Sequence, residues 1–308
     1  MQPPAGTTTR PTILVIGEAI TAFMHYPSDV PLAFHGPFPS GAPAIFASAA
    51  ARLGAQVELV AGVGDDAFGA QFRERLTAHG VSTSCLVVDP TRPTAAVFVS
   101  YQTGGSRSFM FYLEGTAALG ADAAALSLAA PADWLHVSGA TLWFGGKTGA
   151  TAWLAVEQAI ATGTPISFDP NVRADDLSDK LRHRFDTLLG VARVVLASAG
   201  ELEAIGGSEA AILARGGTVV YKMGAAGAVV ATPDGRWSVP APAAPEVDPD
   251  GAGDIFAAGY VVAAAMGIPP RECARVGVVA ASASVAVHGP MESTILPISR
   301  YLEPTGGA

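Results

Sequence analysis

Short runs rich in β-branched residues alternate with longer alanine-rich segments along this chain, and this alternation restricts the fold more than any other feature. Strand-like runs lie at residues 13–16, 57–63, 134–137, 165–168, 194–196 and 219–221, and helical patterns lie between them at 43–53, 66–79, 148–162 and 181–189. Apolar runs of this kind, separated by helices, are typical of parallel strands buried on both faces. The pattern predicts an α/β fold, a three-layer sandwich with a mostly parallel central sheet.

Two segments break this alternation. Residues 19–40 are rich in Pro, Phe and His without a helical period, and residues 94–115 contain two strand-like runs around a Gly-Gly turn. We predict that these segments form a small separate β-sheet, the lid sheet, which serves either as a lid over a ligand or as a surface decoration. The prediction is one domain over 12–300 with both segments inserted in it, and flexible tails at 1–11 and 301–308.

Composition and charge exclude several classes of function. The 308 residues include 18 basic and 27 acidic side chains, so the net charge of -9 repels nucleic acids and anionic lipids. The start lacks the apolar core of a signal peptide, and the apolar stretch at 257–266 is too short to cross a bilayer. Two distant cysteines indicate neither a disulfide framework nor a zinc site. We expect a cytoplasmic protein with a small-molecule partner, and neither a nucleic-acid nor a membrane partner.

Residues 247–259 carry the most informative chemistry. Gly251 and Gly253 let backbone N–H groups approach an anion, and the apolar run after them predicts a helix with its positive end at these glycines. Asp254 is a carboxylate beside that anion, which is unfavourable unless the acid takes a proton from an attacking hydroxyl. The alternative interpretation is that Asp254 caps the helix, as acidic residues often do.

Further segments extend this motif into an ordered set. Asp248 and residues 251–256 match the pattern Asp-Thr-x-Gly-Ala-Gly-Asp-x-Phe, and Gly-containing or polar segments lie at 41–44, 52–55, 62–69, 167–173 and 221–227. In this order the segments resemble the ribokinase-like (PfkB) carbohydrate kinases, in particular the fructokinase and 2-keto-3-deoxygluconate kinase branch. The resemblance covers residues 12–297, and several ordered motifs are more specific than any single one.

The resemblance implies an ATP-dependent kinase that moves the γ-phosphoryl group to a hydroxyl of a sugar or sugar-like molecule. Asp254 is then the catalytic base, and the N–H groups of Gly251, Ala252 and Gly253 belong to the anion hole for the transferred phosphoryl group. The ribokinase-like fold and a homodimer through the lid sheet are implied as well.

The resemblance also implies ATP, Mg²⁺ and a potassium ion. Glu201 matches an acid that organises magnesium and phosphates, although a family Asn is replaced by Ser198. Independently, an acid at the start of a helix is favourable anyway. The implied nucleotide loop contains Lys222, Gly224 and Gly227, and the potassium ion would lie near Asp248.

On the acceptor side, the implied contacts are Gly41, Ala42, Ile45 and Arg173, and Tyr101 of the lid sheet is a further candidate. This side of the site departs most from the family pattern.

Three family contacts are lost in this chain. Ala22 replaces an Asp, Ile45 replaces an Asn, and Leu113 replaces a basic residue. Each missing partner of a substrate hydroxyl costs about 1–3 kcal/mol. We therefore expect a less hydroxylated acceptor, such as a nucleoside or a cyclitol, unless the lid sheet supplies substitute contacts.

A second hypothesis is a catalytically weak regulatory protein that retains nucleotide binding. Ser198 and the unusual Pro249-Asp250 pair favour it.

Overall fold

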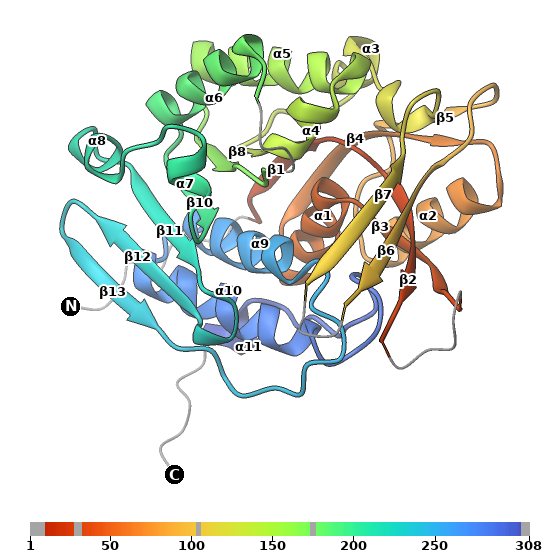
Figure 1. Ribbon diagram of the computed structural model, residues 1–308. Helices are drawn as coiled ribbons and strands as arrows, with labels where there is room; N and C mark the ends of the chain where they lie inside the picture. The colour runs from red at the N-terminus through yellow and green to blue at the C-terminus, as the bar shows by residue number, and fades with distance from the viewer. Residues whose placement is uncertain (1–9, 28–32, 103–105, 173–176, 303–308) are drawn as a thin grey trace.

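The computed structural model describes residues 10–27, 33–102, 106–172 and 177–302. A large central sheet carries helices on both faces, and a smaller sheet projects from one side (Figure 1). This arrangement confirms the predicted α/β sandwich with a small β-sheet.

The central sheet has the strand order β13-β12-β11-β10-β9-β8-β1-β4-β5. All neighbours from β11 to β5 pair in parallel, and β12 and β13 add an antiparallel hairpin at one edge. The direction of chain progression reverses between β1 and β8. The strands are β1 (Thr12–Ile16), β4 (Gln56–Gly64), β5 (Leu86–Asp89), β8 (Trp134–Ser138), β9 (Ile166–Asp169), β10 (Val194–Ser198), β11 (Thr218–Lys222), β12 (Ala228–Thr232) and β13 (Gly235–Val239).

Two groups of helices cover the two faces of this sheet. One hydrophobic core lies beneath α1 (Ala42–Leu53), α2 (Ala67–Ala78), α9 (Ala252–Ala265), α10 (Pro270–Ser284) and α11 (Ser299–Leu302). The other core lies beneath α3 (Ala123–Leu126), α5 (Gly146–Thr162), α6 (Asp179–Val191), α7 (Glu201–Ala204) and α8 (Glu209–Ala214). Shorter elements are α4 (Gly139–Phe144) and the 3-10 helices η1 (Ala117–Leu119) and η2 (Gly224–Ala226).

Helix α9 is apolar on all sides because it packs between α1 and α10. Its residues 255–263 are all buried. At the crossing with α10, a Cβ atom on Gly259 would lie 2.8 Å from the Cα atom of Gly277, so only glycine permits this close approach. The apolar stretch at 257–266, too short to cross a bilayer, is therefore explained by an interior helix. Within the described residues, no helix is long and apolar enough to cross a membrane.

The lid sheet consists of β2 (Ile20–His25), β3 (His35–Ser40), β6 (Ala95–Tyr101) and β7 (Arg107–Tyr112), in the order β3-β2-β6-β7. It unites the two segments that broke the sequence alternation. Burial alternates strictly along β6, so one face of the sheet is turned toward the protein. Ile20, Ala22, Val97 and Val99 lie on this buried inner face.

The chain ends differ slightly from the predicted tails. Arg10 and Pro11 are part of the described structure, and the carbonyl of Pro11 accepts a hydrogen bond from the N–H of Gln56 at 2.9 Å. The predicted C-terminal tail begins two residues too early, because Tyr301 and Leu302 belong to α11 and Tyr301 is buried in the core. The other predicted tail residues lie outside the described ranges.

Candidate active site

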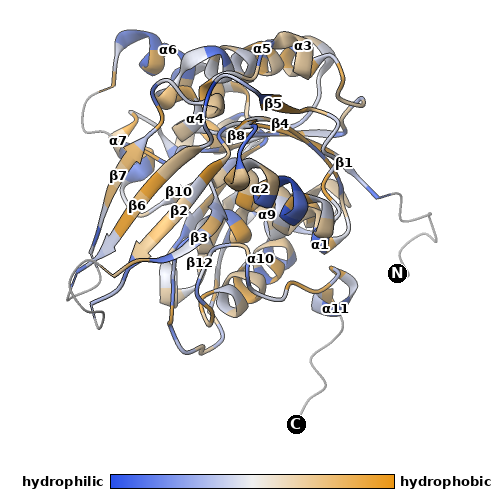
Figure 2. Cartoon of the chain, turned by 90° about the vertical axis from the view of Figure 1, so that its right-hand side faces the viewer, coloured by the Kyte–Doolittle hydropathy of each residue, from blue (hydrophilic) through white to orange (hydrophobic). Residues whose placement is uncertain are grey.

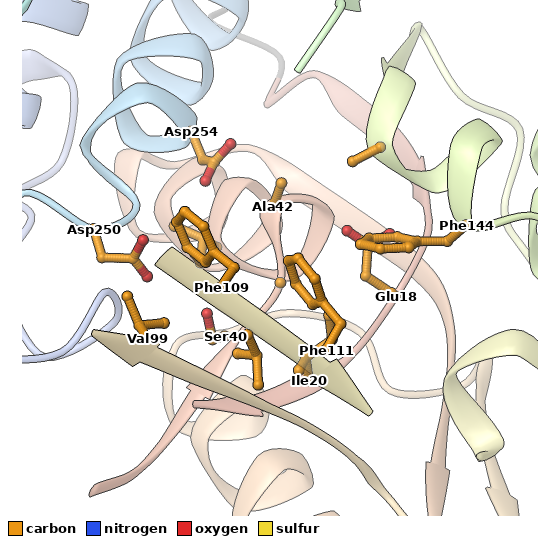
Figure 3. Close-up of a pocket in the computed structure, with 14 residues that line it drawn as sticks. Glu18, Ile20, Ser40, Ala42, Val99, Phe109, Phe111, Phe144, Asp250 and Asp254 are labelled. Carbon is orange, nitrogen blue, oxygen red and sulfur yellow. The ribbon is translucent and has the colours of Figure 1, made fainter. Parts of the chain in front are cut away.

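A pocket lies between the lid sheet and the central sheet, where β1 and β8 end (Figure 3). In open α/β sheets, ligands bind outside the carboxyl ends of the strands at such a reversal of strand order. Because the lid sheet supplies one wall of this pocket, we interpret it as a lid and not as a surface decoration. The lining residues are Glu18, Ile20, Ser40, Gly41, Ala42, Ile45, Val97, Val99, Phe109, Phe111, Ala140, Phe144, Asp250 and Asp254.

Asp254 enters this pocket from the first turn of α9. The helix begins after Gly251, whose φ of 74° is left-handed and whose added Cβ would lie 2.7 Å from Cβ of Pro290. A helix leaves the N–H groups of its first turn without intrahelical partners, and the helix dipole makes this end positive. The structure thus places a half-buried carboxylate beside a group of N–H donors, as the motif predicted.

Lys222 lies next to this turn. A Cβ atom on Gly253 would be 3.7 Å from its Nζ atom, and Nζ donates to Oδ2 of Asp169 at 2.6 Å. Burial by itself lowers the pKa of Lys222, but the negative charges of Asp169, Glu201 and Asp254 outweigh it and raise the pKa. Lys222 therefore stays positively charged, at the edge where phosphates would meet α9.

The carboxylate of Glu201 connects two neighbouring strand ends. Its Oε2 atom accepts from the N–H of Ser198 at 2.6 Å, and its Oε1 atom accepts from the N–H of Val172 at 3.3 Å. Ser198 is paired in register with Lys222. Of the remaining predicted nucleotide residues, Gly224 begins the adjoining η2 and Gly227 directly follows it.

The structure therefore brings the predicted nucleotide residues together at the carboxyl ends of β10 and β11. Among the described residues, no group of three His, Cys, Asp or Glu side chains could hold a metal ion directly.

Asp248, the predicted potassium contact, accepts hydrogen bonds from four donors. Its Oδ1 atom accepts from the hydroxyl of Tyr101 at 2.5 Å and the N–H of Asp250 at 3.0 Å. Its Oδ2 atom accepts from the hydroxyl of Tyr26 at 2.8 Å and the N–H of Gly289 at 2.9 Å. An ionised carboxylate has about four acceptor positions, so these donors occupy it fully. The expected potassium contact at Asp248 does not fit these contacts.

The predicted acceptor residues separate into two sets. Gly41, Ala42 and Ile45 line the pocket together with Asp254. Tyr101 lies outside the lining because its hydroxyl is directed to Asp248. Arg173 falls outside the described residues.

Of the three positions that depart from the family pattern, one lines the pocket and two do not. Ile45 faces the pocket, whereas Ala22 lies beside Val97 on the inner face of the lid sheet without lining the pocket. Leu113 packs in the hydrophobic cluster of the lid sheet.

Sequence reasoning missed the aromatic wall of the pocket. The rings of Phe109 and Phe111 project from β7 into the site, and Phe111 packs edge-on against Phe144 with ring centroids 5.1 Å apart (Figure 3). The alternation of Phe109 and Phe111 along a predicted strand was a detectable signal for one shared face. Phe144 had no such signal, because its place depends on how α4 packs against the lid sheet.

Glu18 was also missed. It follows β1, is 2% exposed, and its Oε2 atom accepts from the hydroxyl of Thr141 at 2.7 Å. This contact holds a carboxylate at the end of the pocket next to Phe144.

Comparison with known proteins provides evidence about function that does not depend on the geometry of the site. The family model described as pfkB family carbohydrate kinase matches residues 11–297. A 2-dehydro-3-deoxygluconokinase from Thermoproteus tenax is 33% identical over 278 residues, which cover 86% of this chain and 84% of that protein.

Solved structures agree in fold. A candidate ribokinase II from E. coli, in complex with ATP and Mg²⁺, has a TM-score of 0.83 and 29% identity, with 95% of this chain and 98% of that chain covered. A fructokinase from Vibrio cholerae with fructose, ADP and calcium bound has a TM-score of 0.80 and 26% identity, with coverages of 94% and 97%.

Proposed function

Because this chain belongs to the pfkB family of carbohydrate kinases, and so transfers phosphate from ATP to a hydroxyl of a sugar or sugar-like molecule, we propose that Asp254 is the base that activates this hydroxyl. One observation carries the proposal. Asp254 lines the acceptor pocket and at the same time belongs to the first turn of α9, whose N–H groups attract phosphate.

In the proposed reaction, the acceptor hydroxyl gives its proton to the Asp254 carboxylate while its oxygen attacks the γ-phosphorus. The bond between this phosphorus and the β–γ bridging oxygen breaks, and ADP leaves. Negative charge on the transferred group is stabilised by the N–H groups at Gly251, Ala252 and Gly253. The ammonium of Lys222 adds a positive charge on the nucleotide side of the same turn.

We assign the nucleotide to the strand ends that carry Ser198, Glu201, Lys222, Gly224 and Gly227. Magnesium, when bound with the nucleotide, neutralises phosphate charge. Glu201 fits an indirect role, because its two backbone hydrogen bonds leave one acceptor position on each oxygen for a metal-bound water. The similar E. coli protein was solved in complex with ATP and Mg²⁺, which supports the binding of both ligands.

The pocket favours an acceptor with one apolar face. Phe109, Phe111 and Phe144 form an aromatic wall, and Ile45 adds an aliphatic surface where a polar contact was expected. None of the described lining residues is basic, whereas Glu18, Asp250 and Asp254 are acidic. We propose a neutral, partly apolar alcohol such as a nucleoside or cyclitol, because an anionic sugar acid would meet like charge.

The outer face of the lid sheet fits a second copy of the chain. Phe98 packs against Phe34 and Tyr112 on this face, and Met110 and Tyr112 are 56% and 55% exposed. Figure 2 shows β6 between β7 and β2 in this sheet. We propose that the chain forms a homodimer through the lid sheet. Light scattering tests this by measuring the molar mass of the unaltered chain and of Met110→Glu, which places a charge on the proposed interface.

We also place the enzyme in the cytoplasm, where ATP is available. Cys85 and Cys273 are free thiols, which fits a reducing compartment.

The decisive experiment measures ADP formation with ATP, Mg²⁺ and a panel of acceptors: fructose, ribose, 2-keto-3-deoxygluconate, adenosine and myo-inositol. We expect ADP formation that depends on one acceptor class, with adenosine or myo-inositol ahead of the sugar acid. ATP binding without any acceptor-dependent turnover across a wider alcohol panel would favour the regulatory-protein hypothesis.

A further inference from the structure

Asp248 is the point at which the lid sheet meets the turn that starts α9. Tyr101 ends β6, Tyr26 directly follows β2, and both hydroxyls donate to the Asp248 carboxylate. The same carboxylate accepts from the N–H groups of Asp250, in the turn, and Gly289, beyond α10. Three distant segments and the turn itself therefore converge on one carboxylate that is 2% exposed.

We propose that Tyr26 and Tyr101 are positioning residues, which couple the seating of the lid sheet to the geometry of the α9 turn and replace a monovalent cation at Asp248. The proposal rests on the proposed function in one respect, namely that this turn carries the base and the anion hole.

The surroundings of the two tyrosines suit a permanent hydrogen-bonded contact. Their rings stack with centroids 5.1 Å apart, and the ring of His288 lies 4.5 Å from that of Tyr26. Burial raises the pKa of Tyr101 strongly, and the negative charges of Asp250 and Asp248 raise it further. Tyr101 therefore remains a protonated donor throughout the range in which the enzyme works.

A second contact reinforces the coupling from the edge of the lid sheet. Nη1 of Arg107, on β7, lies 3.3 Å from Oδ1 of Asp250. This pair is partly exposed, so solvent screens it and it contributes less than the buried hydrogen bonds. Asp250 is nevertheless held from the lid side while its N–H is held by Asp248.

The hydroxyl donors also explain why Asp248 needs no cation. Two O–H groups and two N–H groups direct partial positive charge at the carboxylate, and they use its four acceptor positions. A potassium ion at these oxygens would have to displace at least one buried donor, which would then lack a partner.

Hydrogen exchange of the full-length chain tests the coupling without any acceptor. We compare Tyr26→Phe, Tyr101→Phe and the double variant with Tyr301→Phe, a matched change at a buried tyrosine of α11, whose hydroxyl accepts from the N–H of Leu296 instead. We expect amide exchange in peptides covering residues 248–256 and 285–289 to become about tenfold faster in the double variant, since hydrogen bonds to a charged group are lost. Exchange in β8 should stay unchanged, and Tyr301→Phe should resemble the unaltered chain at residues 248–256.

Kinetics provides the second readout, with whichever of fructose, ribose, adenosine or myo-inositol reacts fastest. We expect kcat of the double variant to fall about tenfold with little change in KM for ATP, and the unaltered enzyme to work equally well in potassium and choline chloride. Unchanged exchange at 248–256 in the double variant, unchanged kcat, or strong activation of the unaltered enzyme by potassium would each overturn the proposal. If no acceptor reacts, the proposed function fails, and the exchange experiment still decides the coupling.

Discussion

The ammonium nitrogen of Lys222 lies 2.6 Å from Oδ2 of Asp169, and this ion pair connects the carboxyl ends of β11 and β9 across β10. The side chains are only 13% and 2% exposed. Each side chain of such a buried pair depends on the other, because removal of either one leaves a buried charge with no opposite charge beside it.

Replacing Lys222 should therefore destabilise the fold as well as the nucleotide side of the site. We expect Lys222→Met to lower the free energy of unfolding by about 3–5 kcal/mol, because Asp169 is left buried and unpaired. The double variant Lys222→Met with Asp169→Asn should recover a large part of this loss. Urea unfolding of Lys222→Met, Asp169→Asn and the double variant measures these losses, and simple additivity of the two single losses would contradict a coupled pair.

Asp254→Asn should abolish turnover while preserving the fold, since it removes the base with almost no change in shape. The expected loss in kcat is about 10²–10⁴-fold. Asp234→Asn, an equivalent change in the exposed turn between β12 and β13, serves as the control. ADP formation and calorimetric ADP binding are the measurements; near-normal turnover would remove Asp254 from the role of base.

Ile45→Asn should shift acceptor preference toward polyols. The new amide would face the pocket and lose hydrogen bonds whenever an apolar acceptor is bound, which costs about 1–3 kcal/mol. We expect the ratio of kcat/KM for fructose over adenosine to rise about tenfold, whereas Ile45→Val leaves it unchanged. Because Ala22 does not line the pocket, the single substitution suffices. An unaltered enzyme with kcat/KM for fructose of about 10⁴ M⁻¹s⁻¹ or better would contradict the proposed apolar preference.

The stability of the protein should fall on mild acidification because of His136. Burial, helped by the charge of Lys222, lowers the pKa of His136 to about 3, and its ring lies against Phe46 with Nδ1 2.9 Å from Oγ of Ser167. Below the ordinary pKa of 6.5, the unfolded chain binds a proton at His136 that the folded chain does not bind. The contribution of His136 to the free energy of unfolding is therefore fully present above pH 6.5, and it is lost progressively as pH falls toward 3.

Between pH 7 and pH 5, we expect protonation of His136 in the unfolded chain to lower the free energy of unfolding by about 2 kcal/mol. His136→Gln should reduce the pH dependence of the unfolding free energy by this amount, and His183→Gln, on the exposed face of α6, should not. Equal slopes for the unaltered chain and His136→Gln would show that another group causes the acid sensitivity.

Much of the architecture was predictable because strand and helix patterns are local. The run 194–196 and the observed β10 differ by two residues at one end, and the predicted helix 66–79 differs from α2 because Asp66 is its N-cap, accepting from the N–H of Gly69 at 2.8 Å. Burial on both faces selects β-branched runs, so such strands are visible in sequence. The family was visible for a related reason, since its motifs are short and ordered along the chain.

By itself, the sequence determined the fold class, the glycine turn before α9 and the position of Asp254 in the first turn of that helix, because these follow from local periodicity and backbone chemistry. Only the tertiary structure decided the partners of Asp248. Tyr26 and Tyr101 are 222 and 147 residues away from it in sequence, and no local pattern relates them. The same holds for Phe144 in the pocket wall and for Asp169 beside Lys222. A side chain's partners depend on which strand ends and loops the whole packed chain brings to one edge of the sheet, and that is a property of the complete fold.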